Sequence, residues 1–229
     1  MHLFISCAGG FGREILDSAK RANTREKRWD DLSFIDDAIE LTSPYAGAVT
    51  YAFPEVLKRV PLQDIEVVVA SGEPAVRRLL FERLRLEGVR TGTVVDPSAI
   101  IADTATLGNG VLVTAFCIVA NSAVIGNNVA MNVQAIVGHD VRVGDHAVIS
   151  SMVNIGGGCS IGENSYVGMG AQIRQGLSIG RDVIIGMGSV VHDDIPDGVI
   201  ALGNPARPMR KNEDKIVFRK TQSRDLHAE

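Results

Sequence analysis

An aliphatic side chain occupies every sixth position from Ile101 to Val191, sixteen positions without a break. Aliphatic residues make up roughly a third of an ordinary chain, so composition does not explain sixteen in phase. A second series lies two residues earlier and is mostly small: Ala99, Ala105, Cys117, Ala123, Ala135, Ala147, Cys159, Ser165, Ala171 and Ser189. A hexad repeat of this kind is the signature of a parallel β-helix.

Side chains alternate along a strand, so we expect both series to point into one closed interior. Three hexads make a triangular coil of eighteen residues, and Val119, Val137 and Ile155 should therefore stack in one column. Glycine often follows the aliphatic residue, and we expect it at tight corners whose backbone conformation disfavours a Cβ. The low aromatic content of 5% fits a narrow interior.

Strands and helices alternate before the repeat. The predicted strands are 2–6, 32–35 and 65–70, and the predicted helices are 13–25, 54–59 and 74–88. This alternation predicts an α/β domain with a parallel sheet over residues 1–95. It has half the length of a dinucleotide-binding fold, so one nucleotide fits better than NAD. Residues 96–208 form the predicted β-helix, here called the prism, and residues 209–229 form a charged tail.

Charge and cysteine content narrow the function classes. The net charge of −4, with no basic block in the first 200 residues, argues against nucleic acid as a partner. We expect no membrane span and no signal peptide. Cys7, Cys117 and Cys159 are widely spaced, and two fall in the inward series, which favours buried reduced thiols in a cytoplasmic protein. No zinc-binding spacing of His and Cys occurs, so no metal site is expected.

A glycine-rich turn, 7–12, joins the first strand to its helix. Exposed N–H groups at a helix N-terminus make a phosphate site. The dinucleotide fingerprint needs a glycine where Cys7 stands, so a sugar-nucleotide phosphate fits better; the alternative is a turn that binds nothing. Asp36 and Asp37 end the second strand, where a carboxylate often meets a ribose or base; the alternative is capping of a helix or turn.

His139 and Asp140 follow Val137 closely, so we expect them on an outward turn of the prism. A neighbouring carboxylate can orient an imidazole that acts as a base. Asn132, one hexad earlier, is expected nearby. The alternative for His139 is a solvated turn residue. We interpret His146 as a surface or interface residue.

Four motifs together resemble the sialic acid O-acetyltransferase and bacillosamine-type sugar N-acetyltransferase family, over residues 1 to about 210. They are the A-G-G-F-G-R-E turn, the F-I-D-D strand end, the hexad repeat with its His-Asp pair, and a closing G-N-P-A-R. The resemblance implies a left-handed β-helix, an exception to the right-handed crossover rule. It also implies a homotrimer that binds acetyl-CoA between neighbouring prisms. Cys7 replaces a usual glycine, Val148 replaces a histidine of many relatives, and Met187 replaces a residue that is commonly small.

The resemblance further implies which residues form the site. His139 would be the general base, supported by Asp140. The nucleotide-linked amino sugar would contact Gly10, Phe11, Gly12, Asp36, Asp37, Gly72 and Asn132. Asp36 and Asp37 would hold the uracil and ribose end, with Gly72 beside it. Acetyl-CoA would contact Gly157, Met169, Met187, Gly203, Asn204, Pro205 and Arg207, with the Gly157 N–H polarising the thioester carbonyl.

The predicted reaction is direct acetyl transfer from acetyl-CoA to the C4 amine of a nucleotide-linked amino sugar, for bacterial glycan or O-antigen biosynthesis. A close alternative is O-acetylation of a sugar hydroxyl, as on sialic acid. Alternatives of other classes are a zinc carbonic anhydrase on the same prism, which needs three convergent histidines, a non-catalytic nucleotide-sensing scaffold, and a stiff structural rod.

Overall fold

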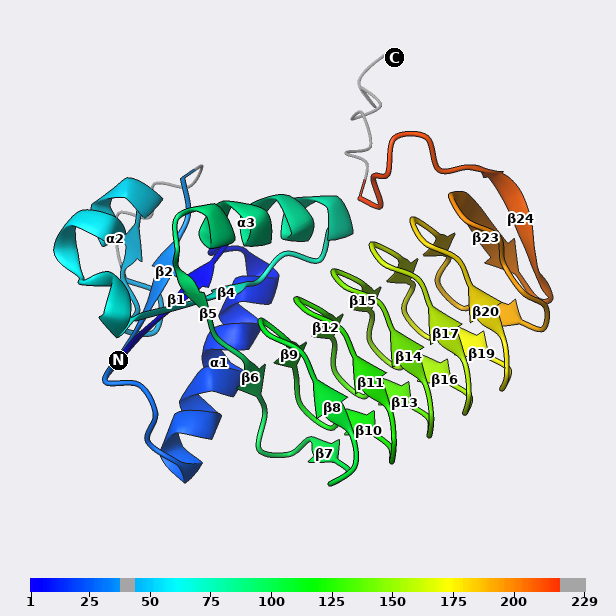
Figure 1. The fold of residues 1–229 in the computed structure, drawn as a ribbon, viewed down its shortest axis with the longest axis horizontal. Helices are drawn as coiled ribbons and strands as arrows, with labels where there is room; N and C mark the ends of the chain where they lie inside the picture. The colour runs from blue at the N-terminus through cyan, green and yellow to red at the C-terminus, as the bar shows by residue number, and fades with distance from the viewer. Residues whose placement is uncertain (38–43, 219–229) are drawn as a thin grey trace, which may run out of the picture.

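A computed structural model describes residues 1–37 and 44–218. It confirms an α/β domain followed by a left-handed parallel β-helix (Figure 1). The N-terminal elements are β1 (His2–Ser6), α1 (Gly10–Arg25), β2 (Asp31–Ile35), β3 (Thr50–Tyr51), α2 (Phe53–Arg59), the 3₁₀ helix η1 (Leu62–Asp64), β4 (Ile65–Val69), α3 (Pro74–Leu86) and β5 (Arg90–Thr91). The five strands form one parallel sheet in the order β3-β2-β1-β4-β5. Helix α1 begins three residues before the predicted start, inside the glycine-rich turn.

The prism has three faces, each named here by its first strand. The β7 face contains β7 (Ile100–Ile101), β10 (Ile118–Val119), β13 (Ile136–Val137), β16 (Asn154–Ile155), β19 (Gln172–Ile173) and β22 (Val190–Val191). The β8 face contains β8 (Thr106–Leu107), β11 (Val124–Ile125), β14 (Arg142–Val143), β17 (Ser160–Ile161) and β20 (Ser178–Ile179). The β6 face contains β6 (Val94–Val95), β9 (Leu112–Val113), β12 (Ala130–Met131), β15 (Val148–Ile149), β18 (Tyr166–Val167), β21 (Ile184–Ile185), β23 (Val199–Gly203) and β24 (Ala206–Lys211).

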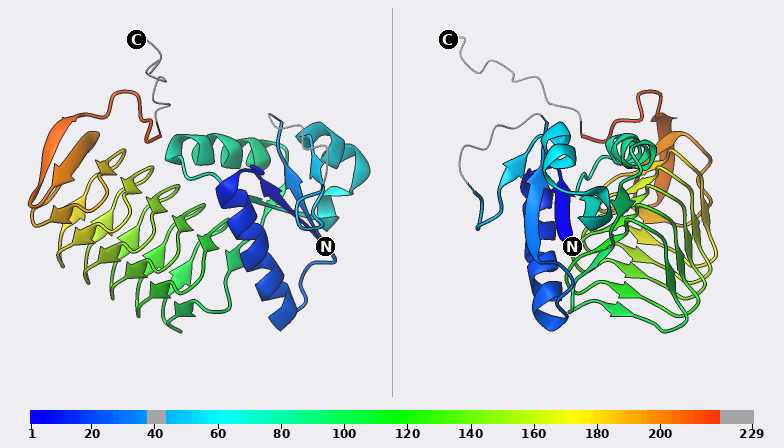
Figure 2. Two further views of the ribbon diagram at one scale, coloured as in Figure 1. Left: turned by 180° about the vertical axis from the view of Figure 1, so that it is seen from behind. Right: turned by 60° about the vertical axis from the view of Figure 1, so that its left-hand side comes forward.

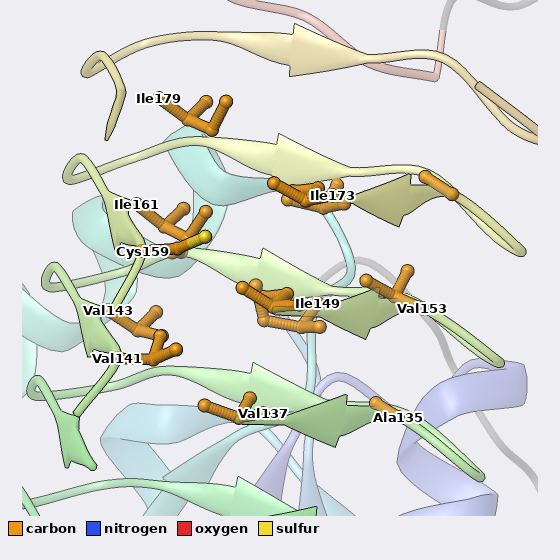
Figure 3. Packing of buried hydrophobic residues seen from close by; sticks show 14 of the residues in the cluster. Ala135, Val137, Val141, Val143, Ile149, Val153, Cys159, Ile161, Ile173 and Ile179 are labelled. Carbon is orange, nitrogen blue, oxygen red and sulfur yellow. The ribbon is translucent and has the colours of Figure 1, made fainter. Parts of the chain in front are cut away.

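The interior of the prism matches the predicted repeat. Val137 pairs with Val119 on one side and with Ile155 on the other, which confirms the eighteen-residue coil. Every aliphatic position from Val113 to Val191 is at most 4% exposed. Figure 3 shows part of this interior, including Val137, Ile149 and Ile161. Val95 continues the series one hexad earlier, so the prism begins with β6, just before the predicted boundary. At the other end, β24 continues to Lys211, past residue 208.

Glycine follows the aliphatic residues for a different reason from the predicted one, which was a backbone conformation that disfavours a Cβ. The left-handed backbone lies two residues further on and is occupied mostly by other residues, such as Phe116 and Asp140, each with φ of +59°. A Cβ on Gly144 would instead lie 2.6 Å from the backbone nitrogen of Glu163, and one on Gly156 2.5 Å from that of Gln175. Close stacking of successive coils therefore requires these glycines.

The N-terminal domain packs against the β6 face, as Figure 2 shows. Outward residues of that face, including Leu112, Ala130 and Val148, join a buried cluster with β1 and α1. Val148, where many relatives carry a histidine, is 1% exposed in this junction. Within the described ranges, none of the helices has the length and apolar character needed to cross a lipid bilayer.

A fully buried arginine ties α3 to the prism. Arg77 donates to the carbonyl oxygens of Asn128, Val69 and Ser71. The Asn128 amide donates to the Arg77 carbonyl at 3.0 Å and lies 3.0 Å from Nδ1 of His146. Burial lowers the pKa of Arg77 to about 9, so the guanidinium stays charged at neutral pH. His146 therefore lies in the interface between α3 and the prism, and burial lowers its pKa.

Candidate active site

His139 and Asp140 lie on the turn between β13 and β14, at the corner where the β7 face meets the β8 face. Nδ1 of His139 is 2.8 Å from Oδ2 of Asp140. The two side chains are 63% and 64% exposed, so the outward orientation expected from the repeat is confirmed. A carboxylate that accepts at Nδ1 favours the tautomer whose Nε2 carries a free lone pair. The pair can therefore present an oriented base to a ligand at this corner.

Gly157 lies one coil beyond His139, under the imidazole ring. A Cβ on Gly157 would lie 2.5 Å from Cε1 and 2.8 Å from Cδ2 of the ring, and closer still to Nε2. Among the described residues we find no acceptor for the Gly157 N–H. Asn109 and Asn127 occupy the same hexad position as Gly157 on another corner. Their N–H groups donate to side chains of the next coil, those of Asn127 and Asp145 respectively. The base thus lies beside a free backbone donor.

The second candidate region is the edge of the parallel sheet where β2, β1 and β4 end. Strand order reverses between β1 and β4, and ligands of open α/β sheets bind outside the carboxyl ends at such a switch point. Helix α1 starts there without a side-chain cap, and its first backbone bond joins the Arg13 N–H to the Gly9 carbonyl. The N–H groups of Gly10, Phe11 and Gly12 precede that bond, so they are positioned to donate to a phosphate.

The glycines of this turn serve two purposes. A Cβ on Gly12 would overlap the carbonyl oxygen of Cys7, so packing of α1 requires that glycine. Cβ atoms on Gly9 and Gly10 would meet nothing within 4 Å, which leaves their outer side open to a ligand. Cys7 adopts φ of +77°, a left-handed conformation that suits the glycine usual in the family. Burial, followed by the nearby Asp36 carboxylate, raises the pKa of its thiol.

A cavity of about 190 Å³ opens beside the ends of β1 and β2. It is lined by Ser6, Cys7, Ile35, Asp36, Asp37, Phe53, Val67, Leu80, Arg83 and Leu84. Whole ligand pockets usually measure about 300–1,000 Å³, so this cavity fits one part of a ligand.

Both aspartates of this cavity hold backbone groups. Asp36 accepts from the Ala8 N–H at 2.9 Å, within the glycine-rich turn. Asp37 accepts from the Phe53 N–H at the start of α2 and from Arg83 of α3. The Phe53 N–H and then the Arg83 guanidinium lower the pKa of Asp37. Both backbone contacts are of the kind that the capping alternative predicts, and both side chains also line the cavity.

The remaining predicted residues lie elsewhere on the chain. Asn132, Met169 and Met187 follow strands of the β6 face and lie at the corner shared with the β7 face. The expected proximity of Asn132 and His139 does not hold within one chain, because one hexad advances the backbone by a whole face and β13 lies between them. Gly72 follows β4, on the opposite side of β1 from Asp36 and Asp37. It therefore lies away from a nucleoside held by those aspartates, and not beside that end as the resemblance implies.

The residues 203–207 form the hairpin between β23 and β24, beside the last coil of the prism. Arg207 in this hairpin donates to Asp193 at 2.8 Å. In the described parts of the chain, no group of three or more His, Cys, Asp or Glu side chains is arranged to hold a metal ion. Sequence reasoning did not find Arg83, whose approach to Asp37 depends on how α3 crosses the sheet.

Comparisons with known proteins agree with this architecture. The PglD N-terminal domain model matches residues 2–84, and the bacterial transferase hexapeptide model (six repeats) matches residues 158–193. A search of curated protein sequences found no match. Among solved structures, the acetyltransferase domain of PglB from Neisseria gonorrhoeae FA1090, also solved with acetyl coenzyme A, is 29% identical with a TM-score of 0.84. The match covers 91% of this chain and 99% of that chain.

Two further solved structures are similarly close. A histidine-to-asparagine mutant of perosamine N-acetyltransferase from Caulobacter crescentus, in complex with CoA and GDP-perosamine, is 27% identical with a TM-score of 0.84. That match covers 92% of this chain and 98% of that chain. WeeI from Acinetobacter baumannii AYE is 28% identical, with 91% of this chain and all of that chain covered and a TM-score of 0.84.

The hexapeptide repeats, the PglD N-terminal domain and the neighbours solved with acetyl coenzyme A or CoA together define this protein as an acyltransferase. A PglD N-terminal domain precedes the prism. The matches over residues 2–84 and 158–193, with the solved acetyltransferases above, bear out the resemblance to the sialic acid O-acetyltransferase and bacillosamine-type sugar N-acetyltransferase family.

Proposed function

We propose that this protein transfers the acetyl group of acetyl-CoA to the C4 amine of a nucleotide-linked amino sugar, in bacterial glycan or O-antigen biosynthesis. The observation that carries the proposal is the His139 imidazole, oriented by Asp140 and lying over the free N–H of Gly157. A relative crystallised with CoA and GDP-perosamine supports this substrate class, and its 27% identity leaves the particular sugar open.

His139 and Gly157 divide the chemistry between them. Nε2 of His139 takes the proton that the amine loses as it attacks the thioester carbonyl, while Asp140 holds the ring through Nδ1. The Gly157 N–H donates to the carbonyl oxygen as negative charge develops on it. The tetrahedral intermediate then collapses to the amide, the C–S bond breaks, and the proton held by His139 passes to the departing CoA thiolate, which leaves as free thiol. Cys159 is two residues from Gly157, but it is 1% exposed and points into the prism. Transfer is therefore direct, without a covalent enzyme intermediate.

An assembly of three chains supplies the second wall of this site. The β7 face and the corner it shares with the β6 face expose apolar side chains: Ile100, Phe116, Val133, Ile136, Met152, Met169 and Met187. Exposed apolar patches of this extent mark interaction surfaces. A second copy packed there brings its own His139 corner beside Met169 and Met187, which then line the pantetheine arm. The turn residues Gly203, Asn204, Pro205 and Arg207 lie near the CoA nucleotide.

The N-terminal domain binds the acceptor. Phosphates accept from the N–H groups of Gly10, Phe11 and Gly12, and the nucleoside lies at Asp36 and Asp37. Gly72 borders the remaining part of the ligand, and Asn132 contacts the sugar where two chains meet. The unpaired thiols of Cys117 and Cys159 fit a reducing compartment such as the cytoplasm.

The test is release of free CoA thiol in the presence of UDP-, GDP- or dTDP-linked 4-amino sugars, after a thermal-shift screen of the same compounds. We expect His139→Ala to lose about 10²- to 10⁴-fold in kcat with its oligomeric mass unchanged. His192→Ala, which removes another exposed histidine of the prism, is the matched control. Near-normal turnover by His139→Ala would remove this residue from the mechanism.

Alternative functions give different outcomes in that assay. The hydroxy counterparts of the same nucleotide sugars test O-acetylation, because one base can serve an amine or a hydroxyl. A nucleotide-sensing scaffold would bind the nucleotides without releasing thiol. The carbonic anhydrase alternative needs three histidines that converge on zinc. His146 is not available as one of them, because it is buried under α3 and bound to Asn128.

A further inference from the structure

The chain beyond β24 returns to the N-terminal domain, as the red segment of Figure 1 shows. Residues 212–218, here called the strap, are fixed first to the prism. The Asn212 N–H donates to the Gly198 carbonyl at 2.8 Å, and its side-chain amide donates to the Asp182 carbonyl at 2.9 Å. Lys215 pairs with the Asp182 carboxylate at 2.9 Å. These contacts anchor the first part of the strap, Asn212 to Lys215, to the prism.

The end of the strap is fixed to the start of α3. The N–H groups of Val217 and Phe218 donate to the Glu73 carboxylate at 3.0 and 3.1 Å. The Phe218 ring meets the Tyr166 ring edge-on, with centroids 5.5 Å apart. A Cβ on Gly72 would lie 3.5 Å from the Phe218 ring, which is ordinary contact. Two backbone donors and the contact with Tyr166 thus place this aromatic side chain beside Gly72.

Sheet order indicates which part of a sugar nucleotide would lie there. Asp36 follows β2, the phosphate turn follows β1 and Gly72 follows β4, and these strands are neighbours in that order. A ligand with its nucleoside at Asp36 and its phosphates at α1 therefore extends its sugar toward Gly72. Phe218 is 59% exposed, so much of its ring remains free for that sugar.

We propose that Phe218 packs against the hexose of the acceptor and helps to set which sugars the enzyme accepts, with Glu73 as the residue that positions it. This inference rests on the proposed function, because it takes the ligand to be a nucleotide sugar. The apolar C–H face of a hexose is the chemistry that an aromatic ring in this place recognises. The strap is thereby part of the acceptor site, although it follows the prism in sequence.

The test compares Phe218→Ala, Phe218→Tyr, Glu73→Ala and the control Ile216→Ala, which removes an exposed apolar side chain of the strap. The acceptor is whichever UDP-, GDP- or dTDP-linked 4-amino sugar the wild type acetylates fastest. We expect Phe218→Ala and Glu73→Ala to raise KM for that acceptor about tenfold. KM for acetyl-CoA and, by calorimetry, the Kd of the matching nucleoside diphosphate should stay unchanged. Phe218→Tyr and Ile216→Ala should behave as wild type.

Each other result has a separate meaning. An unchanged acceptor KM in Phe218→Ala, with wild-type Tm, would overturn the inference and leave the proposed function intact. Equal weakening of the nucleoside diphosphate would also overturn it, because the ring would then contact the nucleoside. If the wild type acetylates none of the three nucleotide sugars, the proposed function fails and this inference fails with it.

Discussion

Substitution of Gly157 by alanine tests the proposed chemistry without removing any of its functional groups. The new methyl group would lie 2.5 Å from Cε1 of His139 and closer to Nε2, whereas ordinary contacts begin at 3.4 Å. Gly157 has no left-handed φ, so alanine fits its backbone. The imidazole side chain is flexible and 63% exposed, and it can move aside at little cost in stability.

The ring must move by about 1 Å, and a displacement of that size can cost about 10²-fold in rate. The Gly157 N–H, Asp140 and the prism interior all remain in place. We therefore expect Gly157→Ala to fold with a wild-type Tm and to lose about 10²-fold in kcat, measured as release of CoA thiol at saturating acetyl-CoA and acceptor.

Gly158→Ala is the matched control. Gly158 has φ of +68°, and a Cβ there would meet nothing within 4 Å, so alanine strains the backbone without a contact between its methyl group and the His139 ring. The Gly158 N–H also donates to the His139 carbonyl, so this control reproduces any effect passed through the backbone. Other coils carry non-glycine residues at this position, including Asp140 and Met152. The control should lose about 1 kcal/mol of stability and keep most of its kcat.

A double-mutant cycle with His139→Ala decides between mechanisms. If Gly157→Ala acts by displacing the ring, it should have almost no further effect once the ring is gone. A kcat near that of wild type in Gly157→Ala would refute the reasoning. An equal loss in Gly158→Ala, or full additivity with His139→Ala, would place the effect in the backbone rather than in the imidazole.

Two further predictions concern residues that hold the site. Asp140→Asn should reduce kcat about tenfold, and Asp140→Ala more, because an asparagine oxygen can still accept from Nδ1 but carries no charge; equal losses in the two variants would contradict this. Cys7→Gly should raise Tm by roughly 2–4 °C, because glycine relieves the left-handed φ of +77°, whereas Cys7→Ala keeps the Cβ and should not; thermal unfolding of both variants checks this.

The prism could be predicted from the sequence because its contacts are local and periodic. Val119, Val137 and Ile155 follow one another at eighteen residues, so counting alone places them in one column. The same counting misplaced Asn132, because a step of six residues changes the face and only a step of eighteen returns to the same corner. The sequence did not reveal why glycine follows the aliphatic residues. A Cβ on Gly144 would clash with Glu163 of the next coil, and this contact exists only once the coils are stacked.

The N-terminal site depends on contacts that no period encodes. The turn at Gly10 and the Asp36 strand end could be located from the sequence, because strand, turn and helix signals are short-range. Arg83 reaches Asp37 from another element, and Phe218 reaches Gly72 across most of the chain. These pairs become neighbours only because α3 crosses the sheet and the strap returns to it, so no local pattern in the sequence predicts them.

The repeat therefore determines the geometry of the catalytic corner, whereas the non-repeating segments determine which acceptor binds. Adjacent coils are spaced like neighbouring strands, about 4.8 Å apart. The Gly158 N–H donates to the His139 carbonyl, and the Gly138 N–H donates to the Ile155 carbonyl. These backbone bonds hold the coil that carries His139 against the next coil, which carries Gly157. The spacing of the two backbones is thus set by the repeat itself, and Asp140 then orients the imidazole over the Gly157 donor. Recognition of the acceptor instead depends on the turn after β1, the aspartates after β2 and the strap, where one substitution can alter specificity without disturbing the coils.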